Sequence, residues 1–122
     1  MLPVRLSYSH GKQTGRIEAL IDSGADDCLF RADIGRAIGI KDIASGPVGE
    51  MAGIVPGVQI PVYYHHVNLW VGSSMIKITA GFTEKTSVGA ILGRRGFFEN
   101  FIITFDPSAN PPGFDIQRLG RA

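Results

Sequence analysis

A single aspartate stands where an apolar stretch of the chain stops. Asp22 follows the apolar run 19–21, and Ser23, Gly24 and Ala25 come directly after it. Ser23 offers a short hydroxyl beside the carboxylate, Gly24 lets a second backbone approach closely, and Ala25 leaves the turn uncrowded. One carboxylate does little hydrolytic chemistry, but two that share a proton can act as general base and general acid on a water molecule. An Asp-Ser-Gly tripeptide alone is usually an ordinary turn, so this interpretation needs a companion motif.

A second motif lies near the other end of the chain. It is Ile91–Arg94, an apolar pair followed by Gly-Arg. Together, in this order and at this separation, the two motifs resemble the signatures of the retropepsin family, the single-domain aspartic proteases of retroviruses and their bacterial and cellular relatives. The first family signature is two apolar residues, Asp, Ser or Thr, Gly and Ala, which here reads 20–25. The second continues as a short helix, here over 95–98, and the resemblance covers about residues 4–106.

The resemblance implies an all-β fold, a retropepsin-like acid protease barrel with one short C-terminal helix, active as a two-fold homodimer. Two-lobed pepsin-type enzymes carry two Asp-Ser/Thr-Gly motifs on one long polypeptide, whereas this chain has 122 residues and one such motif. The second carboxylate would come from a second copy, so that each subunit contributes its Asp22, supported by Ser23 and Gly24. The implied activity is that of an aspartic endopeptidase, which hydrolyses peptide bonds in extended polypeptide segments and needs no metal or cofactor.

The same resemblance implies roles for three polar residues around the Asp22 motif. Ser23 would hydrogen-bond across the two-fold axis beneath the two carboxylates, and its alternative is a local turn-capping hydroxyl. Asp26 would form a structural ion pair with Arg94, since an Arg–carboxylate pair is planar and directional. Asp27 would lie at the edge of the substrate groove. The alternative for both aspartates is a pair of solvated turn residues.

The glycine-rich stretch 46–57 stands where the family has its flap, a mobile hairpin that closes over bound peptide. Glycine permits movement, and exposed backbone groups can pair with an extended substrate strand. The alternative is a long surface loop. The implied substrate-binding residues are Ala25 and Asp27 beside the catalytic motif, Met51, Ala52, Gly53 and Ile54 at the flap tip, and Leu29, Val88 and Ile91 in apolar side-chain pockets. For the last three, a plain β core explains the apolar side chains as well as a pocket does.

Most of the chain has the pattern of strands and turns. Alternating or short apolar runs predict strands over 4–8, 15–21, 28–30, 58–71, 75–82 and 101–105. A hairpin turn is predicted at 72–74, between two of these strands. The segment 32–38 predicts one or two turns of helix, which Gly39 would end. The sequence therefore predicts a mostly β protein with little helix.

Composition argues against several other classes of protein. The formal net charge is +1 and the cations are scattered, so charge gives no case for a nucleic-acid or membrane partner. No stretch approaches the roughly 20 apolar residues that span a bilayer, and the first residues lack the apolar core of a signal peptide. A single cysteine, Cys28, excludes an internal disulfide and suits a reducing compartment. Adjacent His65 and His66 would point to opposite faces of a strand, so they do not predict a metal site. We expect a cytoplasmic protein.

The sequence predicts one domain, 1–106, and a tail, 107–122, that contains Pro and Gly and is a candidate for part of the dimer interface. The end of the tail, 114–122, could be a docked arm or a frayed end. Two other functions stay open. One is a non-catalytic dimeric module that keeps the fold and binds peptide or acts as a scaffold, and the other is a small monomeric β domain with a scaffolding role. The intact Asp22 motif argues against a pure binder, because forcing two carboxylates together has an electrostatic cost.

Overall fold

The described part of the chain is mostly β-strand. The structure, a computed structural model, describes residues 1–51, 60–85, 89–106, 108 and 113–119. Its elements are β1 (Leu2–Ser7), β2 (Ile17–Ile21), β3 (Leu29–Arg31), α1 (Ala32–Ala37), the 3₁₀ turn η1 (Ile43–Ser45), β4 (Val48–Met51), β5 (Ile60–Val71), β6 (Ser74–Thr83), β7 (Ala90–Leu92), β8 (Phe101–Asp106) and β9 (Gly113–Arg118). The six predicted strands are confirmed as β1, β2, β3, β5, β6 and β8, with ends shifted by a few residues.

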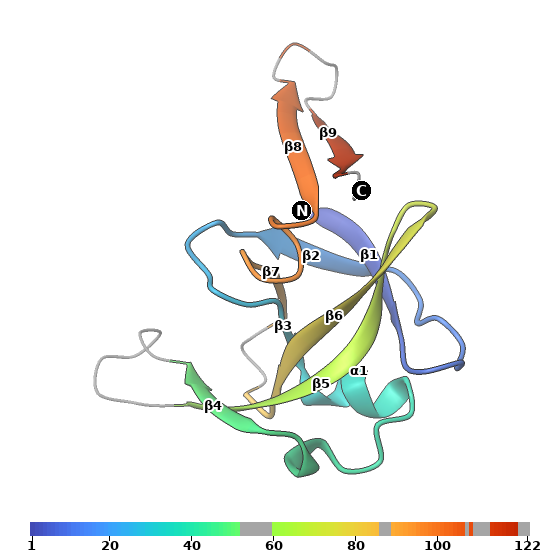
Figure 1. The fold of residues 1–122 in the computed structure, drawn as a ribbon, viewed down its shortest axis with the longest axis vertical. Helices are drawn as coiled ribbons and strands as arrows, with labels where there is room; N and C mark the ends of the chain where they lie inside the picture. The colour runs from blue at the N-terminus through green and yellow to red at the C-terminus, as the bar shows by residue number, and fades with distance from the viewer. Residues whose placement is uncertain (52–59, 86–88, 107, 109–112, 120–122) are drawn as a thin grey trace.

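Six strands close into a barrel in the order β1-β2-β7-β3-β6-β5, and β5 pairs back with β1 (Figure 1). Neighbouring strands are antiparallel except for β2–β7 and β3–β6, which are parallel. The parallel pair β2–β7 places Ile21 beside Leu92, at the carboxyl ends of both strands. The fold therefore brings together the two motifs that stand far apart in the sequence.

The barrel interior holds one main apolar core. In β1 the buried residues Leu2, Val4 and Leu6 alternate with exposed ones, as expected of a strand with one solvent-exposed face. The largest fully buried side chains of the core are Phe30, Phe82, Phe97, Leu6, Leu69 and Leu92. They come from β1, β3, β5, β6, β7 and the turn after β7, so nearly every strand of the barrel contributes to the same core.

Helix α1 confirms the helix predicted over 32–38. It packs closely on the barrel at Gly35, where a Cβ atom would lie 2.7 Å from Ile43 Cδ1 and 2.9 Å from Phe82 Cδ1. A larger residue would push the helix away from β6. None of the helices in the described ranges has the length and apolar character needed to cross a bilayer.

The short C-terminal helix predicted after Arg94 is not formed, and this prediction was wrong. Residues 96–100 form successive turns instead. Gly96 has a φ of +97°, a conformation that interrupts a right-handed helix. The Phe98 N–H donates to the Gly93 carbonyl at 3.2 Å, an i→i+5 bond that is wider than the i→i+4 bond of an α-helix.

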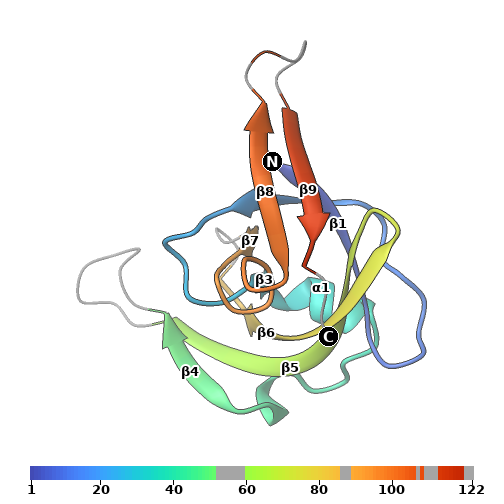
Figure 2. The ribbon, with the colours of Figure 1, turned by 45° about the horizontal axis from the view of Figure 1, so that its top comes forward.

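Strands β8 and β9 form a separate two-stranded sheet that rises from the barrel at the end where the N-terminus lies (Figures 1 and 2). They pair antiparallel from Phe101↔Arg118 to Asp106↔Gly113. Ile103 and Ile116 pack against the main core, whereas Ile102 is 49% exposed. The sequence left two alternatives for 114–122, a docked arm or a frayed end. In the structure this segment is a strand as far as Arg118.

Strand β4 pairs antiparallel with the start of β5, from Val48↔Tyr63 to Met51↔Ile60. The two strands are therefore the arms of a hairpin, the arrangement that the sequence analysis associated with a flap. Met51 ends the first arm. The tip predicted at Ala52, Gly53 and Ile54 lies outside the described residues, and so does Val88.

Candidate active site

The Asp22 carboxylate is positioned by the end of β2. The Asp22 N–H donates to the Leu92 carbonyl at 3.0 Å, which continues the β2–β7 pairing by one residue. The chain then turns, because the Ala25 N–H donates to the Asp22 carbonyl at 3.1 Å and the Gly24 N–H donates to Asp22 Oδ1 at 2.9 Å. A side-chain oxygen that accepts a hydrogen bond from the backbone N–H two residues later is typical of an Asx-turn. One carboxylate oxygen is thus fixed, and the side chain is half-buried at the surface of the barrel.

Gly24 and Ser23 complete this turn. A Cβ atom at Gly24 would lie 3.1 Å from Asp22 Oδ1, so a larger residue would press on the carboxylate. Ser23 is exposed, and its hydroxyl has no partner within the described part of this single chain. Ala25 is half-buried behind the carboxylate. The turn therefore leaves Asp22 and Ser23 on an open surface.

Backbone hydrogen bonds from the second motif fix the position of the Asp22 loop. The Arg94 N–H donates to the Ala25 carbonyl at 2.9 Å, and the Arg95 N–H donates to the Asp26 carbonyl at 2.8 Å. Buried Gly93 permits this approach, because a Cβ atom there would lie 2.3 Å from the Asp27 carbonyl oxygen and 2.8 Å from that of Ala25. Only glycine fits at this position without moving the loop.

Asp26 forms an ion pair with Arg94, as the resemblance implied. Arg94 Nη2 donates to Asp26 Oδ1, and the two side chains are 63% and 62% exposed. A pair this open to water contributes little to stability, because solvent screens both charges. The backbone hydrogen bonds beside it hold the loop more firmly than this pair does.

A second and more sheltered network lies at Asp27, and sequence reasoning missed it. Arg95 donates twice to Asp27, from Nε to Oδ1 at 2.7 Å and from Nη2 to Oδ2 at 2.9 Å. The Tyr64 hydroxyl donates to the same Oδ2 at 3.1 Å. The Asp27 side chain is only 19% exposed. It is neither a solvated turn residue nor a free carboxylate, because three donor groups already engage it.

This network changes the protonation of its members. The hydrogen bonds from Arg95 lower the pKa of the Asp27 carboxyl, and partial burial opposes that shift. Burial raises the pKa of Tyr64, and the nearby Asp27 charge raises it further. Asp27 is therefore ionised over a wider pH range than an ordinary aspartate. One signal for the Asp27–Arg95 pair was present in the sequence. Two adjacent aspartates, 26–27, match two adjacent arginines, 94–95, and the two segments run parallel in the fold.

Leu29 and Ile91 belong to a small apolar cluster outside the main core. They are register partners on β3 and β7, and they pack with Val62 and Tyr64 of β5. Gly81 makes room for this cluster, because a Cβ atom there would lie 2.5 Å from Val62 Cγ1 and 3.0 Å from Leu29 Cδ1. The main core therefore does not explain these two side chains.

Leu20 extends this apolar surface and was also missed by sequence reasoning. It is in register with Ile91 across the parallel pair β2–β7, and paired residues on neighbouring strands place their side chains on the same face. Leu20 is 47% exposed and stands two residues before Asp22. No signal in the sequence indicated this exposure, because Leu20 stands in an apolar run that is usually interpreted as core.

Cys28 lies beneath the loop and is structural. It is completely buried, and its thiol donates to the Arg95 carbonyl at 3.4 Å. Burial raises the pKa of Cys28 to about 11, so the thiol stays protonated at neutral pH. A thiol that is buried and protonated is not a suitable catalytic nucleophile.

Comparison with protein-family models and with curated proteins found no match to this sequence. The function is therefore inferred from the residues and their geometry.

Proposed function

We propose that the protein is an aspartic endopeptidase of the retropepsin type, whose active site forms when two copies each contribute Asp22. The observation that carries this proposal is the placement of the Asp22 carboxylate: it ends a strand, one oxygen accepts the Gly24 N–H, and the loop is fixed from behind by the Ile91–Arg94 motif. An ordinary surface turn has no need of a buried Gly93 pressed against its backbone.

The chemistry needs the two carboxylates to share one proton. Like charges this close resist ionising together, so the pair keeps a single proton over an intermediate pH range, as in other aspartic protease dyads. The ionised Asp22 accepts a proton from a water molecule while the protonated Asp22 donates its proton to the carbonyl oxygen of the peptide bond. The water oxygen bonds to the carbonyl carbon and forms a tetrahedral diol. The Asp22 that took the water proton then donates it to the amide nitrogen while a diol hydroxyl gives its proton to the other Asp22, and the C–N bond breaks to leave a carboxylic acid and an amine. The pair again holds one proton.

The separate β8–β9 sheet supports the proposed dimer. A two-stranded sheet is marginally stable on its own in water, and in the described residues neither strand pairs with a third. Exposed apolar side chains gather on neighbouring elements at this end of the molecule: Met1 is 73% exposed and precedes β1, Leu20 is 47% exposed on the adjacent β2, and Ile102 is 49% exposed on β8. A second copy packed about a two-fold axis would cover these surfaces and bring its own Asp22 loop to the same end.

The apolar surface beside Asp22 supports extended polypeptide as the substrate. Half-buried Ile91 packs with the buried Leu29 and would give the groove an apolar wall, which suits apolar side chains near the cut. Among the described strands β4 pairs only with β5, so its other edge can pair with the backbone of an extended peptide. Asp27, held by Arg95 and Tyr64, would lie at the border of such a groove.

The decisive experiment compares wild type with Asp22→Asn in peptide-library cleavage over about pH 3 to 8. Light scattering would report the size of each protein in solution. The matched control is Asp42→Asn, because Asp42 is exposed and its side chain makes no hydrogen bond or ion pair within the described ranges. We expect cleavage by wild type and Asp42→Asn, none by Asp22→Asn, and dimers in all three.

Mixing subunits sharpens the test. Wild type mixed with an equal amount of Asp22→Asn should retain about half of its cleavage rate after exchange, because half of the wild-type subunits then sit in mixed dimers with one carboxylate. A rate unaffected by the mutant subunits would contradict a site shared between copies. The second candidate function is a non-catalytic dimeric peptide-binding module, and it is favoured if a folded dimer binds peptides equally well with and without Asp22 and cleaves none.

A further inference from the structure

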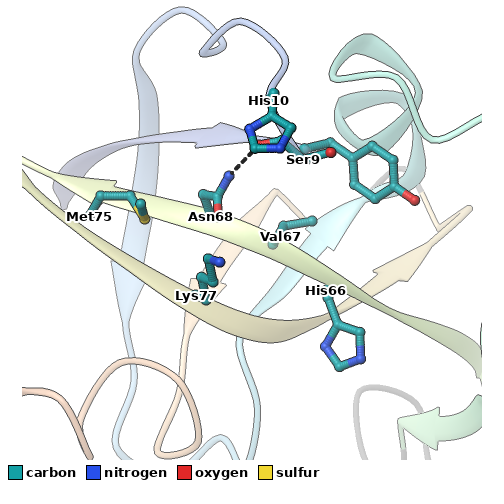
Figure 3. Close-up of a pocket in the computed structure, with 8 residues that line it drawn as sticks. Ser9, His10, His66, Val67, Asn68, Met75 and Lys77 are labelled. Atoms are coloured by element: carbon teal, nitrogen blue, oxygen red, sulfur yellow. Dashed lines mark hydrogen bonds between the residues drawn. The ribbon is translucent and has the colours of Figure 1, made fainter.

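A cavity of about 500 Å³ lies between the turn that follows β1 and the β5–β6 hairpin (Figure 3). Because β1 and β2 are antiparallel, Asp22 follows one end of the pair, whereas Tyr8 and His10 follow the other. Six residues of strand separate the two ends, a distance of about 20 Å. The cavity is therefore distinct from the Asp22 loop, and Lys77 alone of its lining residues also lines the neighbouring cavity beside Asp27 and Tyr64.

Positive and hydrogen-bonding groups dominate its polar lining. His10, His66 and Lys77 line it, and none of its lining residues is an aspartate or glutamate. Lys77 lies directly across from Asn68 on the β5–β6 hairpin, and His66 is its diagonal neighbour, so the three side chains share one face. A ligand in the cavity would meet an ammonium and an imidazole together, a pair that favours an anion, whereas the Asn68 amide already donates to Ser7 Oγ and to the Ser9 carbonyl.

Lys77 forms no ion pair with the carboxylates on its other side, within the described part of the chain. A neighbouring cavity also includes Lys77 among its lining residues, and two carboxylates line it as well. Asp27 is paired with Arg95, whereas Glu99 keeps its charge and accepts only the neutral Gly96 N–H at 2.8 Å. Lys77 itself has no ion pair among the described residues. Its ammonium is available to a ligand.

The rim of the cavity is built by a strained turn that Asn68 holds in place. Ser9 has a φ of +55°, an unusual value for a residue other than glycine, and the turn closes with the Gly11 N–H donating to the Tyr8 carbonyl at 2.9 Å. Asn68 Nδ2 donates to the Ser9 carbonyl at 3.0 Å, the bond drawn in Figure 3. Strain of this kind tends to occur where a fold fixes a functional side chain. Here the turn sets His10 above the cavity.

The ring of His66 is also fixed. Its Nδ1 lies 3.0 Å from Thr79 Oγ1, and Nε2 has no partner within the described part of the chain. The side chain of Met75 provides an apolar wall; Val67 also lines the cavity, but it is only 3% exposed and belongs to the main core. A wall of this kind suits an anion carried on a methylene stem, such as a glutamate side chain, better than a fully hydrated inorganic ion.

We propose that this cavity binds an acidic segment of a polypeptide, with carboxylates placed against Lys77, His66 and His10 and side-chain stems against Met75. Its volume exceeds that of one side chain, and it is open on one side, so a segment of several residues can enter. The proposal does not depend on catalysis at Asp22, because binding at this cavity can be measured without any cleavage.

The test uses a fluorescein-labelled hexaglutamate peptide and a matched hexaglutamine peptide, with binding read by fluorescence anisotropy at low salt. We expect wild type to bind the hexaglutamate and not the hexaglutamine. Lys77→Gln should weaken binding about two- to fivefold, and the double variant His66→Gln, Lys77→Gln about tenfold, as expected for removing exposed charge contacts. The matched control is Lys41→Gln, which removes an exposed lysine outside the cavity and should leave the affinity unchanged.

Three outcomes would overturn the proposal. The first is unchanged hexaglutamate binding by the double variant, shown by circular dichroism to be folded. The second is equal weakening by Lys41→Gln and Lys77→Gln, because binding would then reflect overall charge. The third is saturable binding of inorganic phosphate by wild type without binding of hexaglutamate, which would assign the cavity to a small anion instead of a polypeptide.

Discussion

Replacing Gly93 by alanine should damage both the fold and the proposed active site. A Cβ atom at this position would lie 2.3 Å from the Asp27 carbonyl oxygen, 2.7 Å from the Asp27 carbonyl carbon and 2.8 Å from the Ala25 carbonyl oxygen. Such atoms are essentially never closer than 3.0 Å, so the chain must shift by about 0.7 Å. All three neighbours are backbone atoms of the Asp22 loop, and no side chain can rotate away to relieve the contact.

The cost follows from overpacking. Forcing an extra methyl group into a well-packed site typically costs ~1–3 kcal/mol, and the upper end applies here because backbone must move. The reduced freedom of the unfolded chain offsets ~0.4–1 kcal/mol of this. We therefore expect a net loss of about 2 kcal/mol in the free energy of unfolding, which lowers Tm by about 6–10 °C for a domain of this size.

Urea unfolding followed by Trp70 fluorescence measures this loss. Trp70 Nε1 donates to Ser7 Oγ at 3.0 Å, so its surroundings change when β1 and β5 separate. All proteins must be compared at one concentration, because a dimer makes stability depend on concentration. The matched control is Gly15→Ala, since a Cβ atom at Gly15 meets nothing within 4 Å. It should be neutral or slightly stabilising.

The reasoning fails if the free energy of unfolding of Gly93→Ala lies within about 0.5 kcal/mol of the wild-type value, which is the range of a harmless surface substitution. Cleavage at a temperature where Gly93→Ala is still folded gives a second reading. We expect a reduced rate there, because the same shift displaces the loop that carries Asp22. A stable but inactive Gly93→Ala would show that the loop moved without loss of the barrel.

Two further predictions concern ionisable groups. The pKa of Asp27 is lowered in the folded state by Arg95, so its contribution to stability is present above the ordinary aspartate value of about 4 and is lost as pH falls through the lowered folded value. Between about pH 5 and 2 the stability of wild type should therefore fall more steeply than that of Asp27→Asn, and parallel curves would contradict the assignment. Cys28 is buried with its pKa raised to about 11, so only about one thiol in a thousand is ionised at pH 8. Its reaction with a thiol reagent should be about a hundredfold slower in the native protein than in urea, and rapid native labelling would show that the loop above it opens readily.

The sequence predicted the long strands well because their pattern is local. Alternation along 58–71 and 75–82, with turn residues between them, needs no knowledge of the rest of the chain. The helix after Arg94 was predicted wrongly because its outcome depends on Gly96, whose positive φ interrupts the helix while a Cβ atom there would crowd Cys28 Sγ at 3.2 Å. That contact comes from a distant part of the chain and leaves no local signal.

The sequence predicted the ion pair Asp26–Arg94 but not the ion pair Asp27–Arg95. Tyr64 completes the second network from 37 residues away, and its hydroxyl reaches Asp27 only because of where β5 lies in the barrel. The exposed Leu20 was likewise hidden, since a leucine in an apolar run is usually interpreted as core. Long-range strand pairing decides both cases, and a single sequence does not specify it.

The two ion pairs beside Asp22 differ in what they can do for the loop. Asp26 and Arg94 are both mostly exposed, so water competes for their contact, whereas Asp27 is sheltered and accepts from two different side chains. Even so, neither pair fixes the catalytic carboxylate directly. Asp22 is held by backbone N–H groups and by the β2–β7 pairing, and the loop approaches the second motif because Gly93 has no side chain. Gly93 therefore matters more for the position of Asp22 than the charges around it, because a Cβ atom there would lie only 2.3–2.8 Å from the loop backbone and only glycine lets the loop pack this closely.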